Sequence, residues 1–386
     1  MTSRLLPLAL LATLGTTACG STCEAGEICT WFGTPGVAGL SEDGTHRLEA
    51  RTFWVVDVAF HPTEGWPVLM DWNNHRVITL DEEDRVQTIT GIGGFLGDGP
   101  PGDALNAEWN HPTDVSWQSD GSMILAAWHN SRVARISPDL STVEFIAGTG
   151  GRDFSGDGGP AVDAVLDLPC GLRVADDDSI YIADMANQRI RRIDNDGIID
   201  TVAGTGQHGF NGDGPALETM LASPALQRAE PAFKLDYHEG SLYLADTHNG
   251  RVRRFDIEAG TITTIAGMGE TPPDSANGVT CTSGCGYSGD GGPATEAMLQ
   301  TPSDVAVGPD GTVYIADTDN SCIRAVSPDG TIDTFAGVCG TPGFDGDFGP
   351  ADEALLDRPF GVSVDNDGAV YISDTYNSVV RKVVPE

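Results

Sequence analysis

The chain has 386 residues, with 57 acidic against 21 basic side chains and a formal charge of −36 at pH 7. This acidity argues against nucleic acid as a partner and against adhesion to anionic lipid, because both need Lys and Arg close to phosphate groups. Hydrophobic residues make up 40 % of the chain, which is enough for a core, and 49 Gly with 23 Pro indicate many turns.

Residues 1–18 have the layout of a secretory signal peptide. Arg4 precedes an apolar stretch, residues 5–14, and small residues follow up to Ala18. The stretch is shorter than the ~20 residues of a membrane-spanning helix. Cys19 comes next, so the segment resembles a bacterial lipoprotein signal, although Thr16 stands where that pattern usually has Leu. The resemblance implies a lipidated Cys19, and secretion with a free Cys19 thiol is the alternative.

The same resemblance implies a location. The mature protein is expected in the bacterial cell envelope or outside the cell, held to a membrane by the lipid alone, with the outer membrane favoured in a Gram-negative cell. Residues 19–27 would be a tether, and residues 28–386 the folded domain.

From residue 28 onward the chain repeats one pattern six times. An Asn recurs in every copy, and an Asp precedes it by three residues in all copies but the second, which has Ala127. A Gly-Asp-Gly element lies upstream in most copies. The recurring residues are Asp71, Asp184, Asp246, Asp317 and Asp374, with Asn74, Asn130, Asn187, Asn249, Asn320 and Asn377.

Each copy is expected to form four short strands. In the fifth copy these are residues 304–307, 313–317, 322–326 and 331–337, separated by Asp-Gly turns and an Asp-x-x-Asn turn. Tandem four-stranded antiparallel units predict an all-β fold, a six-bladed β-propeller. The last copy lacks its fourth strand, and residues 28–33 match that strand's pattern, so an N-terminal strand should close the last blade.

These repeats resemble the NHL family. The carrying segments are Tyr181 to Ile193, Tyr243 to Phe255 and Ala203 to Ala216, and the resemblance covers residues 28–386. It implies the propeller fold. It is far less specific for function, because such propellers serve as sensors, as docking platforms and occasionally as enzymes.

One face of such a propeller carries the Gly-Asp-Gly loops and the Asp-x-x-Asn turns, and the hairpin turns lie on the other. The repeated Asp and Asn are interpreted as architecture, since a short carboxylate can accept backbone N–H groups and Asn tolerates tight turns. An Arg five residues after the Asp is expected to pair with it. A functional site should then appear where the repeat is broken.

The first break is in the second copy, where Ala127 replaces Asp but Arg132 remains. All seven Trp lie in the first third of the chain. Exposed Trp beside a freed Arg is typical of a surface that binds a protein or a glycan. The candidate binding residues, unless some of the Trp fill gaps between blades, are Trp72, Trp109, Trp128, His129 and Arg132.

The second break is in copies five and six, where Cys322 and Val379 replace the Arg. Asp317 and Asp374 would then lack a cation within the repeat and could bind Ca²⁺. Turn capping alone is the alternative, and no cofactor is otherwise required.

A catalytic interpretation is weaker. His75, His129 and His248 lie in equivalent turns and could meet at the channel mouth, as a zinc site requires. Related propeller enzymes hold a metal in the channel, so a metal-dependent lyase or hydrolase is the alternative function. Neither a G-x-S-x-G element nor a P-loop occurs, and no catalytic residue is assigned.

The cysteines suit an oxidising compartment. Cys281 pairs most simply with Cys285 in one loop, Cys23 with Cys29, and Cys322 with Cys339, which leaves Cys170 free. A zinc site is disfavoured, because paired C-x-x-C elements are missing from the sequence.

The sequence therefore predicts an exported, monomeric propeller that acts as a non-catalytic binding or protein-interaction module through its loop-rich face. Besides the metal-dependent enzyme, a purely structural surface protein remains an alternative.

Overall fold

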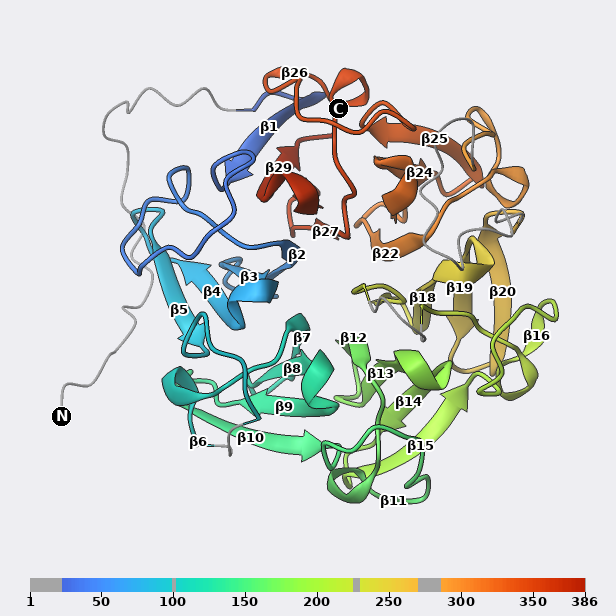
Figure 1. The fold of residues 1–386 in the computed structure, drawn as a ribbon. Helices are drawn as coiled ribbons and strands as arrows, with labels where there is room; N and C mark the ends of the chain where they lie inside the picture. Colours follow the sequence, from blue (N-terminus) through green and yellow to red (C-terminus); the bar gives the residue numbers. More distant parts are fainter. Residues whose placement is uncertain (1–22, 99–101, 225–229, 270–285, 386) are drawn as a thin grey trace.

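A computed structural model describes residues 23–98, 102–224, 230–269 and 286–385. Six antiparallel sheets stand in a ring around a central axis, one blade after another in chain order (Figure 1). The predicted fold, an all-β six-bladed propeller, is confirmed. The sites predicted at Cys19, Cys281 and Cys285 lie outside the described residues.

The innermost strand of each blade faces the axis and the next two strands follow outward. The innermost strands are β2 (Val55–Phe60), β7 (Pro112–Trp117), β12 (Pro169–Val174), β17 (Leu235–His238), β22 (Pro302–Val307) and β27 (Gly361–Val364). The second strands are β3 (Pro67–Asp71), β8 (Met123–Ala127), β13 (Ile180–Asp184), β18 (Ser241–Asp246), β23 (Val313–Asp317) and β28 (Val370–Asp374). The third strands are β4 (Arg76–Leu80), β9 (Arg132–Ile136), β14 (Arg189–Ile193), β19 (Arg251–Asp256), β24 (Cys322–Val326) and β29 (Val379–Val383).

The second strands explain why the blades stack. In β8, β13, β23 and β28 every residue is buried, because each blade packs between two neighbours and both faces of the strand are covered. Such strands read as continuous apolar runs rather than as an alternation. The fourth strands are β5 (Val86–Thr90), β10 (Thr142–Ala147), β15 (Ile198–Ala203), β20 (Thr261–Ala266), β25 (Thr331–Ala336) and, for the last blade, β1 (Glu27–Phe32).

Five blades carry one more strand than expected. A two-residue strand just after the Gly-Asp-Gly element pairs with the fourth strand, as Gly159 does with Ile199. Blade 1 keeps four strands. These short strands are β6 (Gly102–Asp103), β11 (Gly159–Pro160), β16 (Gly214–Pro215), β21 (Gly292–Pro293) and β26 (Gly349–Pro350). In these five sheets they cover part of the outer edge, which limits edge-to-edge pairing between molecules.

The N-terminal strand closes the last blade, as predicted. β1 pairs with β29 in antiparallel register, with Ile28 opposite Val383, and β26 covers its other side (Figure 1). Both ends of the described chain therefore meet in one sheet, and the ring has no open blade.

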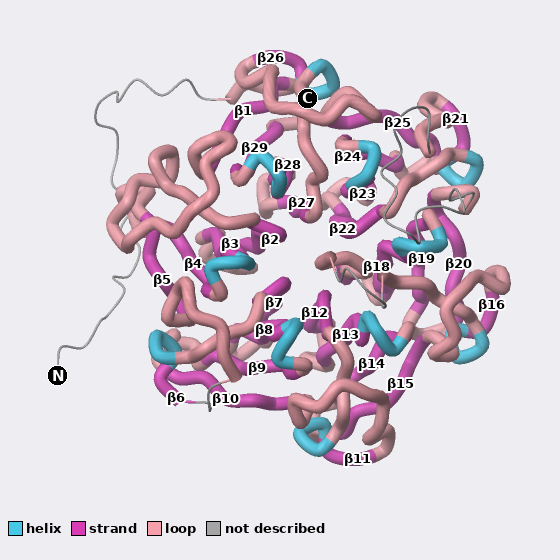
Figure 2. The backbone as a smooth tube through the Cα atoms, viewed as in Figure 1, coloured by secondary structure: helices cyan, strands magenta, loops and turns pink. Residues whose placement is uncertain are grey.

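Single turns of 3₁₀ helix connect the strands (Figure 2). One set follows the second strands and ends on a residue with left-handed backbone: η1 (Trp72–Asn74), η3 (Trp128–Asn130), η5 (Met185–Asn187), η7 (Thr247–Asn249), η10 (Thr318–Asn320) and η12 (Thr375–Asn377). The other set follows the short outer strands: η2 (Ala104–Asn106), η4 (Ala161–Asp163), η6 (Ala216–Glu218), η9 (Ala294–Glu296) and η11 (Ala351–Glu353).

Two disulfides tie described segments together. Cys23 is joined to Cys29 and Cys322 to Cys339, and Cys170 is a buried thiol. Among the described residues, no helix is long and apolar enough to cross a membrane.

Candidate functional site

The repeated Asp and Asn hold the turn that follows each second strand. In blade 3, buried Asp184 accepts the backbone N–H of Asp167 at 2.8 Å and the side-chain amide of Asn187 at 2.8 Å. Asn187 also donates to the carbonyl of Asp153, which belongs to the loop between blades. Equivalent bonds join Asn to Asp in blades 1, 4, 5 and 6.

In most blades the repeated Asp pairs with a different arginine from the one expected five residues after it. Only in blade 1 does the Arg five residues later pair with it, Arg76 with Asp71 at 2.9 Å, among the described blades. In blade 3 the partner is Arg191, seven residues after Asp184, whereas Arg189 donates to the carbonyl of Thr205.

Arg191 is part of a set of contacts that recurs around the ring. Its guanidinium lies 3.2 Å from Asp184 and 2.6 Å from Asp157 of the Gly-Asp-Gly element, with the Phe154 ring 4.7 Å away. We call this set the arginine relay. The same relay is built by Arg253, Arg324 and Arg381 in blades 4, 5 and 6, with Phe210, Tyr287 and Phe344 as the aromatic partners.

Blade 2 lacks the relay. Ala127 stands at the Asp position and Ala134 at the Arg position, both fully buried. Phe95 matches Phe154 in the F-x-G-D-G pattern. Phe154 lies under both Arg189 and Arg191, whereas blade 2 has Ala134 in place of Arg191, and its Arg132, the counterpart of Arg189, sits over Phe145 instead. Phe95 is 67 % exposed and the adjacent Leu96 is 62 % exposed.

Other apolar side chains lie next to this loop. Leu40 and Ile92 are also exposed, and Leu40 rests on the loop so closely that a Cβ added at Gly94 would lie 3.6 Å from it. Leu40, Ile92, Phe95 and Leu96 form what we call the blade 2 apolar patch. It lies on the face that carries the Gly-Asp-Gly loops.

The expectation that Trp72, Trp109 and Trp128 are exposed is wrong. They are 6 %, 1 % and 0 % exposed and belong to the core between blades. Trp72 stacks on Trp54 with ring centroids 5.7 Å apart. The first residue of the turn after a second strand points toward the neighbouring blade, which is why Trp72 and Trp128 fill gaps instead of facing solvent.

Arg132 is not freed by the loss of Asp at position 127. Its guanidinium lies 3.2 Å from Asp98, donates to the Thr149 carbonyl at 2.8 Å and sits over the Phe145 ring at 4.4 Å. Asp98, which a relay arginine would otherwise engage, is therefore taken by Arg132 and by Asn130.

Three histidines meet beside these tryptophans. His129 Nδ1 lies 2.8 Å from His111 Nδ1, and His75 Nδ1 accepts the backbone N–H of His111 at 3.3 Å. Of the three histidines that could have met in a metal site, His75 and His129 both contact His111, while His248 pairs with His208. His111 was missed because it lies in a loop between blades, just before Pro112, rather than in a repeat turn.

Burial and the neighbouring imidazoles keep this cluster uncharged. They lower the pKa of His111 to about 3, and burial lowers the pKa of His129 to about 4. His111 Nδ1 lies 2.7 Å from Asn110 Oδ1 and Nε2 lies 3.1 Å from Asn73 Oδ1, so a neutral His111 ring, with its single N–H, can donate a hydrogen bond to only one of these two amides. The cluster is then a neutral hydrogen-bonding edge of the face.

The other side of the channel mouth is charged. Arg358 lies 2.8 Å from Glu230 and 2.9 Å from Asp319, and its guanidinium sits over the Tyr376 ring at 5.0 Å. Tyr376 stacks in turn on Trp54, with centroids 4.9 Å apart. Stacked rings therefore run from blade 6 across blade 1 toward blade 2.

The premise of a calcium site at Asp317 and Asp374 is also wrong. Arg324 lies 3.8 Å from Asp317 and Arg381 lies 3.7 Å from Asp374, so each carboxylate has a cation within its own blade. Asn320 and Asn377 occupy further lone pairs. Within the described ranges, no group of three or more His, Cys, Asp or Glu is arranged to hold a metal ion.

A buried ionic network lies nearest the axis, and sequence reasoning missed it. Lys234 Nζ is 2.9 Å from Asp57 and 3.5 Å from Asp304, and it donates to the carbonyl of Val56. Arg173 joins Asp114 to Asp236 nearby. Burial raises the pKa of Asp304 to about 7, although Lys234 opposes the shift. The sequence did contain one signal for it: Lys234, one of only two Lys in the chain, lies directly before the innermost strand of blade 4.

Comparisons with known proteins agree with this architecture. A family model described as the teneurin NHL domain matches residues 143–220 and 213–327. Teneurin-1 of Mus musculus is 30 % identical over 298 residues, which are 70 % of this chain and 10 % of that protein. The chloroplastic protein SUPPRESSOR OF QUENCHING 1 of Arabidopsis thaliana is 31 % identical over 237 residues, 58 % of this chain and 20 % of that one. The chain thus spans a tenth to a fifth of these relatives.

Solved structures share the fold at low identity. A protein of unknown function from Bacteroides thetaiotaomicron superposes with a TM-score of 0.61 at 17 % identity, covering 92 % of this chain and 74 % of that one. An auxiliary nutrient binding protein from the same organism gives 0.60 at 16 % identity, covering 92 % and 75 %.

Proposed function

Because the chain is a six-bladed β-propeller built from NHL repeats, we propose that it is a non-catalytic interaction module that captures a protein partner through the loop-rich face of blades 1 and 2. One observation carries the proposal. Blade 2 has lost the arginine relay, and its Phe95 is 67 % exposed beside Leu96, whereas the equivalent Phe210, Tyr287 and Phe344 of relay blades are 37–41 % exposed.

The exposed pair has the chemistry of a binding hot spot. Burying a large apolar side chain contributes about 1.5–3 kcal/mol, so two adjacent ones held on a loop can anchor a partner. Contiguous exposed apolar side chains are uncommon on soluble monomers and mark interaction sites. Leu40 and Ile92 enlarge the patch, and polar loop residues around it would form the rim.

The buried tryptophans act as support under this proposal. Trp72 and Trp128 pack in the core beside the histidine cluster and fix the turns of blades 1 and 2. Partner contacts then fall to side chains at the surface: the blade 2 apolar patch, His129 and the edge of Tyr376. A protein of this fold is named a nutrient binding protein, which agrees with a binding role. An exported, lipid-anchored location through Cys19 is part of the proposal.

The test compares two equivalent phenylalanines. The double variant Phe95→Ala/Leu96→Ala should lose most partner capture in cross-linking of the full chain to an envelope fraction, read by quantitative mass spectrometry. Phe210→Ala is the matched control, since Phe210 occupies the same place in blade 4 beneath Arg251 and Arg253. We expect the control to capture the same protein as the wild type.

Three results would contradict the proposal. Capture that survives in the double variant would show that the apolar patch is not the contact. A glycan array that binds the wild type and the double variant equally would move recognition to another ligand class. A stoichiometric metal in the purified protein, together with turnover, would favour the metal-dependent enzyme.

A further inference from the structure

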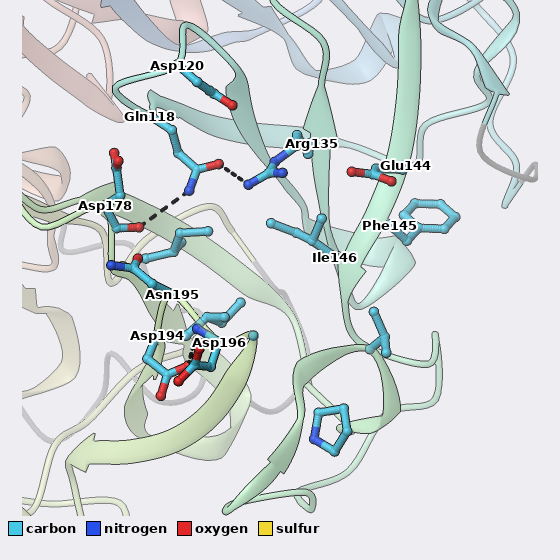
Figure 3. Close-up of a pocket in the computed structure, with 15 residues that line it drawn as sticks. Gln118, Asp120, Arg135, Glu144, Phe145, Ile146, Asp178, Asp194, Asn195 and Asp196 are labelled. Carbon is cyan, nitrogen blue, oxygen red and sulfur yellow. Dashed lines mark hydrogen bonds between the residues drawn. The ribbon is translucent and has the colours of Figure 1, made fainter.

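A groove lies between blades 2 and 3, beside the hairpin turns and thus away from the channel mouth (Figure 3). It has a volume of about 590 Å³ and is bordered by the turn at Asp120 and the turn at residues 194–197. Val162 of η4 lies among its lining residues. This surface is separate from the blade 2 apolar patch, so the inference does not depend on the proposed function.

The groove has an apolar floor. Ile180 and Ile193 are buried and belong to the core between the two blades, and half-buried Ile146 packs against them. Val162 remains 50 % exposed. An apolar side chain of a ligand could therefore be buried on this floor without any separation of the two blades.

The rim is strongly acidic. Among the residues that line the groove, the carboxylates come from Asp120, Glu144, Asp178, Asp194 and Asp196, whereas Arg135 supplies the single positive charge. Arg135 donates to the side-chain oxygen of Gln118, whose amide donates to the carbonyl of Asp178 (Figure 3).

We propose that this groove binds a cationic segment of a partner protein, in which Lys or Arg side chains alternate with apolar ones. An extended segment places alternate side chains on opposite sides. Its apolar side chains would rest on Ile146 and Val162, and its cations would meet Glu144 and Asp196 at the rim. Anionic ligands are excluded by the same charges.

The repeat supplies matched controls one blade further along. Leu217 of η6 holds the place that Val162 holds in η4 and is 60 % exposed. Asp200 in β15 matches Glu144 in β10, since each faces an Arg of the third strand in register. Glu258, in the turn before β20, matches Asp196 in the turn before β15, and both are exposed.

The probe is the fluorescently labelled peptide acetyl-Lys-Leu-Lys-Leu-Lys-amide, titrated against the full chain at physiological salt and read by anisotropy. We expect saturable one-to-one binding. Glu144→Gln/Asp196→Asn and Val162→Ser should each weaken it about fivefold or more. Asp200→Asn/Glu258→Gln and Leu217→Ser should leave it within about twofold of the wild type.

Several outcomes would overturn the inference. Weakening of equal size in the control variants would mean that the overall charge of −36 attracts the peptide without a site. Equal binding of a peptide with Ser in place of Leu, or of spermidine, would remove the role of the apolar floor. Failure of the wild type to bind saturably would also refute it. Because every substituted side chain is exposed, circular dichroism should show all variants folded.

Discussion

At the scale of single residues, this fold buries charge in two ways. Arginine relays give buried carboxylates a cation, yet burial still raises the pKa of Asp246 to about 6, against the effect of Arg253 at 3.1 Å. The histidine cluster takes the opposite course, because its imidazoles lose their charge when the chain folds. Both solutions make stability depend on pH, with opposite signs.

His111 should make the protein acid-sensitive. Its pKa is about 3 in the folded chain and near 6.5 when unfolded, so the unfolded chain binds the proton more readily. The stability that this neutral imidazole contributes is complete above pH 6.5 and is lost as pH falls toward 3. His111→Gln should therefore reduce the loss of unfolding free energy between pH 7 and pH 5 by about 1–2 kcal/mol.

Urea unfolding at the two pH values measures this difference. His238→Gln is the control, because His238 lies beside the hairpin turn of blade 4, on the opposite face. An unchanged difference between pH 7 and pH 5 in His111→Gln would show that His111 does not stay neutral in the fold.

At the scale of the blade, pattern and spacing were sufficient for the strands and insufficient for the contacts. Four apolar segments between Asp-Gly turns predict a blade, and the fourth-strand pattern at residues 28–33 predicts the closure. Spacing alone could not tell which arginine meets Asp184, because Arg189 and Arg191 lie on the same side of β14. Blade 1 shows what determines the choice of arginine. Ile78 occupies the position of the relay arginine there, and Arg76 forms the ion pair with Asp71 instead.

The prediction of exposed binding residues was wrong for a related reason. Loop position and residue type suggested that Trp72 and Trp128 are exposed, but the direction of a side chain at the start of a turn depends on the neighbouring blade, which a single repeat does not contain. The useful signal was the paired loss at Ala127 and Ala134. Reading both positions together points to the Gly-Asp-Gly loop of blade 2, because Phe95 lacks the relay arginine that stands 4.7–5.0 Å from the equivalent rings of blades 3 to 6.

The closing strand β1 should detach from the last blade more easily than the other fourth strands detach from theirs. Ile28 and Ile332 occupy equivalent fourth-strand positions, and both are fully buried. Ile28→Ala and Ile332→Ala should each lower the free energy of unfolding by about 2–4 kcal/mol. Only Ile28→Ala should also speed hydrogen exchange in β29, because β1 is not joined to β29 by a hairpin and can detach locally. Equal exchange in β29 of both variants would contradict this.

At the scale of the whole molecule, the ring is held together at the axis by charges as well as by apolar packing. Asp57, Asp114 and Asp304 come from three different blades, and they accept N–H groups or cations of their neighbours, as Asp114 does from the backbone of Leu172 and from Arg173. Lys234 connects blade 4 to blades 1 and 5. A substitution that removes one of these charged groups should therefore disturb the packing of several blades.

Lys234→Met tests this role of the axis. The variant keeps most of the volume but leaves Asp57 and Asp304 buried without their shared cation, and removing one partner of a buried ion pair typically lowers stability by about 3–5 kcal/mol.

The other lysine is the matched control: Lys382 lies in β29 near the surface, over the Tyr371 ring at 5.0 Å, and Lys382→Met should change the unfolding free energy by less than about 1 kcal/mol. Chemical denaturation gives both values. Lys234 lowers the pKa of Asp304, which is about 7 in the wild type, so the variant should hold a proton on Asp304 more readily than the wild type. The loss in Lys234→Met should therefore be smaller at pH 5, where Asp304 is protonated in both proteins, than at pH 7. A loss that is small, or that grows on acidification, would show that the network at the axis does not join the blades as described.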